Sequence, residues 1–428
     1  MGSLSARLLL RWMAFALPLL SLTYLVRFRL AGLPSTLLEV LLGVFVLGVI
    51  LTTKRAGLAR AHQALYAWRW PIVVWVLATL IAVGISPSLW TGIGLWRAYI
   101  LEPLLVLIAL CAILDQPGDR KRMEQGMMVA ASVASVWAIV GYLGNWGIPH
   151  PWNVAIDAGR RAVGPFGFPN GVALFVTPIG ALVAARLATL FAESRTQIKK
   201  DWTKFVLPLV TFFLIVVALV AAKSDGGMGA LAFVVMLSLL GLRWGRWLVL
   251  VGAVLGVLGF VAAPSLRAAF IQEVTFKGWS GKVRLFIWSE TWAMLKDHWF
   301  FGAGFGGYKK VFDAYHKARF IEIFQYPHTI LFNFWTETGL PGVFAFIGIV
   351  VTWVKNAVRT VIAKATTENM KYLPVLVLLA PLIAMLIHGL VDVPYFKNDL
   401  ALLFWIFVWF VIAAKSERAE LADSSAID

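Results

Sequence analysis

The chain has 428 residues, of which 60% are hydrophobic and only 14% are charged, and its mean hydropathy is +0.82. Soluble domains are about 45–50% apolar and about 25% charged, so this composition excludes a set of soluble domains as well as disordered and fibrous chains. The net charge of +16 is compatible with nucleic acid, with anionic lipid, or with the loop bias that orients membrane helices. A polytopic membrane protein is the class that remains.

The N-terminal segment resembles a signal peptide, because Arg7 and Arg11 precede an apolar stretch. No convincing cleavage site follows, and Arg27 and Arg29 come directly after the stretch, so we expect a retained first helix. The single cysteine, Cys111, lies in an apolar run, which excludes an intrachain disulfide and a cysteine-based metal site.

Apolar segments long enough for membrane helices recur along the whole chain. A transmembrane helix needs about 20 mostly apolar residues. Twelve segments are predicted to span the membrane, at 8–27, 35–53, 70–87, 92–114, 127–145, 170–192, 203–222, 228–242, 246–263, 329–354, 372–391 and 399–414. The sequence thus predicts an all-α fold in which residues 1–428 form a single transmembrane domain, with both termini on the same side.

Basic residues are concentrated in every second loop. If both termini are cytoplasmic, every inside loop is basic, as at Lys54–Arg55, Arg120–Arg122 and Lys355–Arg359, and the short outside loops hold few basic residues. This distribution follows the positive-inside rule and predicts the orientation. Most of the excess charge therefore indicates topology, and no nucleic-acid partner is expected.

Residues 264–328 form an outside loop that is too long for a simple connector. Basic residues outnumber acidic ones in it, which favours an anionic ligand or contact with lipid headgroups. Large apolar residues recur at helical spacing, which predicts an interfacial helix lying on the bilayer, at Leu285, Trp288, Trp292, Leu295 and Trp299.

Several ionisable residues fall on the predicted outside of the membrane. His328 opens the span at 329–354, and its side chain is either a helix cap or a general base, because an imidazole can accept a proton from a hydroxyl. Guanidinium groups bind phosphate oxygens through paired donors, although a surface arginine is most often only solvated. The other candidates on this side are Arg160, Arg161, Lys223, Arg284, His388 and Asp392.

Two apparent motifs do not indicate a site. Gly302–Gly307 matches GxGxxG, but it follows a predicted helix rather than a strand, so we expect a flexible turn instead of a dinucleotide site. The outside acidic residues are scattered, so neither a metal nor another cofactor is expected.

Four motifs follow one another between residues 160 and 400. They are Gly164-Pro165-Phe166-Gly167-Phe168-Pro169-Asn170 preceded by Arg161; Ser280-Gly281-Lys282-Val283-Arg284 followed by Trp288 and Phe301-Gly302-Ala303-Gly304; Pro327-His328-Thr329 with Glu337-Thr338-Gly339-Leu340-Pro341-Gly342; and His388-Gly389-Leu390-Val391-Asp392. Together they resemble the O-antigen ligase and Wzy-polymerase superfamily of bacterial envelope glycosyltransferases. Where that family often has Ser-Arg-Gly at a helix end, this chain has Lys223-Ser224-Asp225-Gly226, which leaves the role of Lys223 open.

The resemblance implies a GT-C-like, metal-independent membrane glycosyltransferase whose active site faces the periplasm from the bacterial inner membrane. The donor would be a polysaccharide on undecaprenyl diphosphate and the acceptor a sugar hydroxyl of lipid A–core. His328 would be the general base of an inverting displacement. Arg161 and Arg284 would hold the pyrophosphate, with Arg160, Lys223, His388 and Asp392 as further substrate-binding candidates.

Alternatives remain open at this point. A Wzy-type polymerase joins repeat units on the same carrier, and other relatives attach glycans to protein. The single long outside loop favours the ligase over the polymerase. A transporter or flippase of a lipid-linked substrate is a different class, and the concentration of charge at the outer face rather than at the midplane disfavours it.

Overall fold

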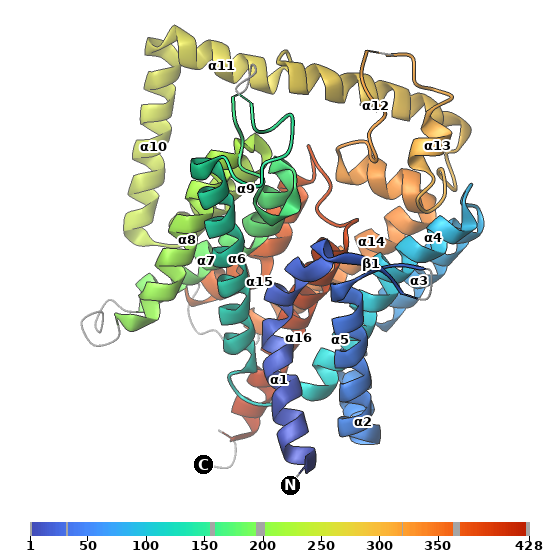
Figure 1. The fold of residues 1–428 in the computed structure, drawn as a ribbon. Helices are drawn as coiled ribbons and strands as arrows, with labels where there is room; N and C mark the ends of the chain where they lie inside the picture. Colours follow the sequence, from blue (N-terminus) through green and yellow to red (C-terminus); the bar gives the residue numbers. More distant parts are fainter. Residues whose placement is uncertain are drawn as a thin grey trace.

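Helices dominate the computed structural model, which describes residues 2–30, 33–154, 159–193, 202–318, 320–362 and 369–424 (Figure 1). Most of the long helices run side by side in one bundle. The apolar helices are α1 (Gly2–Leu20), α2 (Leu37–Leu65), α3 (Arg69–Gly84), α4 (Leu89–Trp96), α5 (Glu102–Ile113), α6 (Asp119–Gly144), α7 (Pro169–Glu193), α8 (Thr203–Ala222), α9 (Asp225–Leu240), α10 (Arg243–Ala262), α14 (Ile330–Ile362), α15 (Asn369–His388) and α16 (Asn398–Ser424).

Each predicted apolar segment lies mainly on these helices, although the segment 8–27 runs past α1 and the segment 372–391 runs past α15, and the protein is a polytopic helical membrane protein. Among the described residues, nine helical stretches are long and apolar enough to cross a membrane, and α3, α9 and α15 are shorter apolar helices. Twelve crossings therefore remain a prediction. The all-α expectation misses one small element between α1 and α2, an antiparallel hairpin of β1 (Arg27–Leu30) and β2 (Leu33–Thr36).

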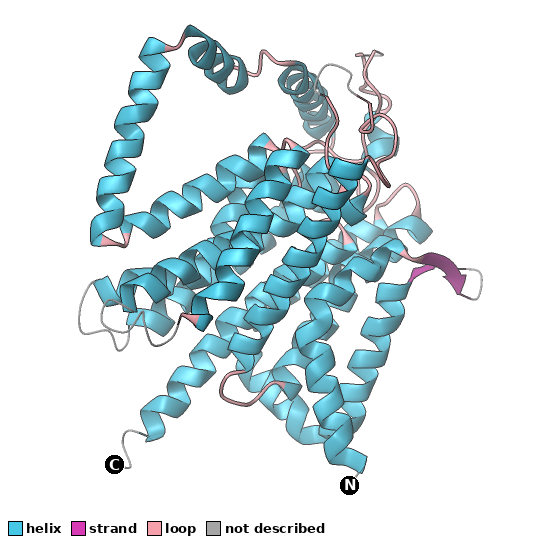
Figure 2. Ribbon diagram, turned by 60° about the vertical axis from the view of Figure 1, so that its left-hand side comes forward, coloured by secondary structure: helices cyan, strands magenta, loops and turns pink. Residues whose placement is uncertain are grey.

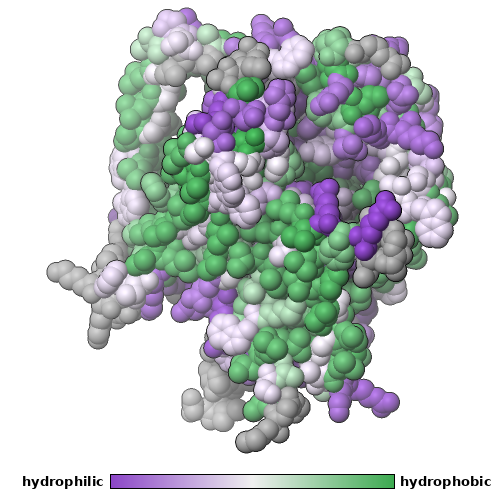
Figure 3. All heavy atoms as spheres, viewed as in Figure 1, coloured by the Kyte–Doolittle hydropathy of each residue, from purple (hydrophilic) through white to green (hydrophobic). Residues whose placement is uncertain are grey.

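The two ends of the bundle differ in what they carry. The start of α1 and the end of α16 lie at one end, which we call the terminal face (Figures 1 and 2). The helices α11 (Pro264–Val274), α12 (Trp279–Asp297) and α13 (Tyr308–Phe312) cover the opposite end, which we call the pocket face. Hydrophobic side chains cover the bundle between these ends, and hydrophilic ones gather around the pocket face (Figure 3).

The centre of the bundle is built around α7 and α16. In each of these helices 83% of the apolar window is buried inside the protein. Small residues in α7 allow close helix approach, since a Cβ added at Gly180 would lie 3.1 Å from Ile215 of α8. The start of α7 is therefore firmly placed at the pocket face.

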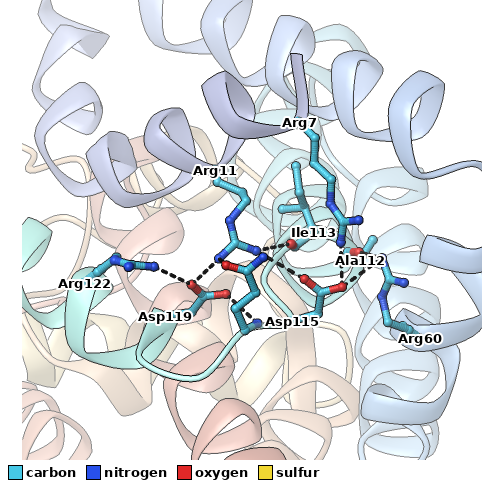
Figure 4. Close-up of polar contacts among 9 residues, drawn as sticks. Arg7, Arg11, Arg60, Ala112, Ile113, Asp115, Asp119 and Arg122 are labelled. Atoms are coloured by element: carbon cyan, nitrogen blue, oxygen red, sulfur yellow. Dashed lines mark hydrogen bonds and ion pairs between the residues drawn. The ribbon is translucent and has the colours of Figure 1, made fainter. Parts of the chain in front are cut away.

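Buried ion pairs join α1 to the α5–α6 connection at the terminal face (Figure 4). Arg11 lies 2.5 Å from Asp119 and 3.2 Å from Asp115, and Arg7 lies 2.6 Å from Asp115. Arg11 and Asp119 are only 5% and 3% exposed, so each charge depends on the other for its solvation. This cluster is far along the bundle from the pocket face and serves to hold helices together.

Residues 264–328 contain a helix, α12, where the sequence predicts one. Its buried side chains are Ile287, Glu290, Thr291, Met294 and Leu295. The apolar members of this set pack with Tyr308 and Phe312 of α13 in a small separate core. Leu285, Trp292 and Trp299 of the predicted interfacial face are exposed at the protein surface. That this face lies on the bilayer stays a prediction.

The glycine-rich segment Gly302–Gly307 is a packed joint rather than a flexible turn. Gly304 has φ +79°, and a Cβ there would lie 2.8 Å from the backbone of Ser86 after α3. The Phe305 N–H donates to the Ala82 carbonyl at 2.9 Å. Glycine is needed here because two backbones meet at a distance that no side chain permits.

Helix α10 stands apart from the rest of the bundle. Only 6% of its apolar window is buried, and it packs mainly on α9 and α11. Figure 2 shows α10 extending beyond the other helices, and Figure 3 shows open space between α10 and the helices beside it. Its apolar surface is therefore left for lipid to cover.

Candidate active site

A pocket of about 540 Å³ lies at the pocket face, beneath the α11–α12 segment. It is lined from four parts of the chain that are distant in sequence: the start of α7, the α8–α9 turn, the α11–α12 segment and the end of α15. Of the predicted site residues, the pocket brings together Arg161, Lys223, Arg284, His388 and Asp392. His328 lies behind Asp392 and is not among the lining residues.

Tight turns before α7 position Arg161 and Asn170. Gly164 and Gly167 have φ values of +51° and +75°, and the short helix η3 (Gly164–Phe166) lies between Arg161 and α7. A Cβ at Gly164 would lie 3.2 Å from Ala138, so the turn presses closely against α6. These positive φ values explain why glycines occupy the turn.

Arg161 caps the end of α8. Its Nε donates to the Ala222 carbonyl at 2.8 Å and its Nη2 donates to the Lys223 carbonyl at 2.9 Å. These carbonyls are at the negative end of the helix dipole, which a guanidinium stabilises. Burial lowers the pKa of Arg161, whereas the charge of Asp225 raises it. Two of its nitrogens therefore already donate hydrogen bonds to backbone carbonyls.

The α8–α9 turn brings a second cation to the pocket. Lys223 adopts a left-handed conformation with φ 49°, and α9 begins two residues later at Asp225. Left-handed backbone is uncommon for residues other than glycine and often marks functional positions. Lys223 lines the same pocket as Arg161 and Arg284.

Arg284 connects α12 to the loop after α15. Its Nε donates to the Val391 carbonyl at 3.1 Å, and its Nη1 donates to Ser280 Oγ at 2.8 Å. The side chain therefore links α12 to the segment after α15 at the pocket. Arg284 is therefore held in place before any ligand binds.

His328 and Asp392 form a pair beside the pocket. His328 Nδ1 lies 3.7 Å from Asp392 Oδ1, which is an ion-pair distance longer than a hydrogen bond. Nδ1 is buried and has no hydrogen-bond partner among the described residues, and the His328 backbone is left-handed with φ 52°. Such a pair can hold an imidazole so that its Nε2 accepts a proton. Catalytic hydrogen bonds are often longer before substrate binds.

The ring of His328 is held by its neighbours. Phe324 and Tyr326 pack edge-on with ring centroids 4.9 Å and 4.8 Å from it. Trp288 Nε1 donates to the Pro327 carbonyl at 2.8 Å and so ties this segment to α12. Burial raises the pKa of the Tyr326 hydroxyl well above its ordinary value, and the charge of Asp392 raises it further.

Asp392 is 1% exposed and is the most connected group of the site. It accepts a hydrogen bond from Asn170 Nδ2 at 2.6 Å and from the Val393 N–H at 2.8 Å. Burial raises its pKa, but the close contact with the His328 imidazole, the charge of His388 and the Val393 N–H together lower it more, so the pKa lies below its usual value. Asp392 is therefore a buried carboxylate near an imidazole that also lines the pocket.

The two remaining candidates differ in position. His388 ends α15, is 3% exposed and lines the pocket. A Cβ at Gly226 would lie 3.0 Å from its ring, so α9 approaches it closely. Arg160 does not line the pocket, and its guanidinium lies 5.0 Å from the ring centroid of Tyr142.

Sequence reasoning did not assign Asn170 or Tyr326 to the site. Asn170 belongs to the glycine-rich motif before α7, and Tyr326 lies two residues before His328. Proximity to the motifs was the signal available. Only the fold shows that both side chains converge on Asp392.

The comparison with known families covers the second and third of the four motifs. The O-antigen ligase family model matches residues 210–347, a segment that contains Lys223, Arg284 and His328. This match confirms the resemblance seen in the sequence. A search among curated proteins finds no match.

Proposed function

Because residues 210–347 match the O-antigen ligase family model, we propose that the protein transfers a polysaccharide from undecaprenyl diphosphate to a sugar hydroxyl of lipid A–core. The reaction takes place on the periplasmic face of the bacterial inner membrane, in a GT-C-like membrane glycosyltransferase. The observation that carries the proposal is the His328–Asp392 pair beside a pocket with three cations.

The pocket binds the diphosphate of the donor. Arg161, Lys223 and Arg284 line it, and cations close to phosphate oxygens stabilise the negative charge that develops on a leaving diphosphate. Both arginines are anchored by backbone carbonyls, so little side-chain freedom is lost on binding. The glycosyl donor is already activated, and no nucleotide is needed.

His328 acts as the general base. Its Nε2 takes the proton of the acceptor hydroxyl while the hydroxyl oxygen attacks the anomeric carbon. The bond between that carbon and the diphosphate oxygen breaks, and undecaprenyl diphosphate leaves. A single displacement inverts the anomeric configuration. Asp392 stabilises the imidazolium that forms.

The donor enters from the side. Both proposed substrates are anchored in lipid, and the isolation of α10 leaves open space next to the bundle (Figure 3). Val274 and Phe276, at the end of α11, contribute apolar surface to the pocket wall. An entrance on the α10 side lets the polyprenyl chain stay in lipid while the diphosphate reaches the cations.

Purified protein tests the proposal directly when it is supplied with lipid-linked polysaccharide and lipid A–core. We expect attachment of polysaccharide to the core, and a rate about 10²- to 10⁴-fold lower for His328→Ala. His62→Ala is the matched control, since His62 lies exposed in the last turn of α2, outside the residues that line the pocket, and should leave the rate unchanged. Excess chelator should not inhibit the reaction.

The same assay distinguishes the alternatives. Extension of the polymer on its carrier without transfer to the core would identify a polymerase. Attachment to an added protein acceptor would identify a protein-glycosylating ligase, and movement of the donor without a new glycosidic bond would identify a transporter. A wild-type rate for His328→Ala would remove the proposed base.

A further inference from the structure

Asn170 connects the cation side of the pocket to the carboxylate side. It lies one residue after the start of α7, half-buried in the pocket wall. Arg161 Nη2 donates to its Oδ1 at 3.3 Å, and its Nδ2 donates to Asp392 Oδ2 at 2.6 Å. Asp392 in turn faces His328. Four side chains thus form one continuous polar chain across the site.

The neighbours of Asn170 require a side chain that both donates and accepts hydrogen bonds, as an amide does. A guanidinium only donates hydrogen bonds and a carboxylate only accepts them. The group between Arg161 and Asp392 must therefore accept on one side and donate on the other. Flipping the amide would bring its NH₂ against the guanidinium and its oxygen against the carboxylate, so the network fixes one orientation.

The bond to Asn170 determines which way the Asp392 carboxylate faces. Its Oδ2 is held by Asn170, and its Oδ1 is held by the Val393 N–H and faces His328 Nδ1. Without the amide, one oxygen of a buried carboxylate loses a donor, and the group gains freedom to rotate. Rotation would take Oδ1 away from the imidazole that it orients.

We propose that Asn170 is a positioning residue for the glycosyl transfer, fixing Asp392 so that the carboxylate holds His328 in the orientation of a general base. The inference rests on the proposed function of His328. Asn170 does not hold the phosphate-binding arginine in place, because Arg161 is already anchored by the carbonyls of Ala222 and Lys223. Its effect should therefore appear in kcat rather than in the KM of the donor.

Steady-state kinetics on Asn170→Ala and on the isosteric Asn170→Asp test the role. A displaced catalytic group can cost about 100-fold, so we expect kcat to fall about 10- to 100-fold with the donor KM changed by less than about twofold. Asn170→Gln keeps the amide and should recover part of the rate. Asn356→Ala, whose amide caps a carbonyl within α14 away from the pocket, is the matched control and should match wild type.

A double-mutant cycle with Asp392→Asn shows whether Asn170 acts through the carboxylate. Once the carboxylate is neutral, adding Asn170→Ala should lower kcat by less than about twofold more, because coupled residues are not additive. If Asn170→Ala lowers kcat by the same factor with and without Asp392→Asn, the inference is overturned. A raised donor KM with unchanged kcat in Asn170→Ala would also overturn it. If His328→Ala is inactive but Asn170→Ala equals wild type, the inference alone fails. If His328→Ala equals wild type, the proposed function fails.

Discussion

Arg161 and Arg284 each use part of their guanidinium to hold backbone at the rim of the pocket. Each donates its Nε to a carbonyl, of Ala222 and of Val391 respectively. The same side chains therefore shape the pocket and give it positive charge. At the scale of single residues, a structural and a binding role coexist in one side chain.

The neighbours Arg160 and Arg161 allow a matched test of donor binding. Arg161→Ala removes a cation from the pocket, and charge-assisted hydrogen bonds are worth about 1.5–3 kcal/mol, so affinity for undecaprenyl diphosphate should fall about 10- to 100-fold. Arg160→Ala should leave the affinity unchanged, because Arg160 stacks over Tyr142 outside the pocket. Binding to purified variants measures both, and equal losses would contradict the assignment.

At the scale of elements, a carboxylate holds together the segment that covers the pocket. Glu290 of α12 accepts hydrogen bonds from His316 Nδ1 and from the N–H groups of Lys317 and Ala318, all at 2.9 Å. His316 Nε2 lies 2.9 Å from the Ile321 carbonyl. This contact fixes the chain after α13 against α12 and so supports the wall that carries Arg284.

The Glu290 contact predicts an acid-sensitive covering segment. Burial raises the pKa of Glu290, but the hydrogen bonds from His316, Ala318 and Lys317 lower it more, so the folded pKa is depressed. The ionised Glu290 therefore stabilises the folded segment. This stabilisation is complete above the unfolded pKa of glutamate, about 4.3, and is lost as the pH falls through the folded pKa.

Limited proteolysis of residues 264–328 across pH measures this effect. The wild-type segment should resist cleavage at neutral pH and lose resistance in acid. Glu290→Gln should be cleaved faster already at neutral pH, with a stability loss of roughly 1–3 kcal/mol. Glu322→Gln, an exposed change in the same segment, should behave as wild type. Unchanged protection in Glu290→Gln at neutral pH would contradict the role.

At the scale of the whole molecule, the terminal face contributes to stability and the pocket face contains the proposed site. The terminal face is joined by the ion pairs of Arg7 and Arg11 with Asp115 and Asp119 (Figure 4). The pocket face carries the polar chain from Arg161 to His328. Changes at the terminal face should therefore affect stability without affecting substrate binding.

Asp119→Ala tests this separation. It leaves Arg11 buried without its nearest partner, and breaking a buried pair costs about 3–5 kcal/mol, so the thermal midpoint in detergent should fall clearly. Arg122→Ala removes a contact of 3.4 Å from a side chain that is 48% exposed, and should cost less than about 1 kcal/mol. The donor KM of folded protein should not change in either variant, and an altered KM would contradict separate faces.

The membrane architecture could be predicted from the sequence because its physical basis is local. Apolar length predicts helices, and each predicted apolar segment lies mainly on helix in the structure. The family motifs could be recognised in the sequence for a similar reason, because glycine turns and a histidine at a helix start are local patterns. The sequence did not reveal which residues of α12 the protein itself buries, because the covering partner, α13, is a tertiary neighbour.

Composition and local motifs are enough to identify a hydrophobic, basic, polytopic membrane protein that resembles a glycosyltransferase family. Which of its charged residues meet depends on how the helices pack. Asn170 and Asp392 lie 222 positions apart and are joined by one hydrogen bond, while the adjacent Arg160 and Arg161 point to different surroundings. Hydropathy acts through local composition, but a polar site depends on the geometry in which distant helix ends converge.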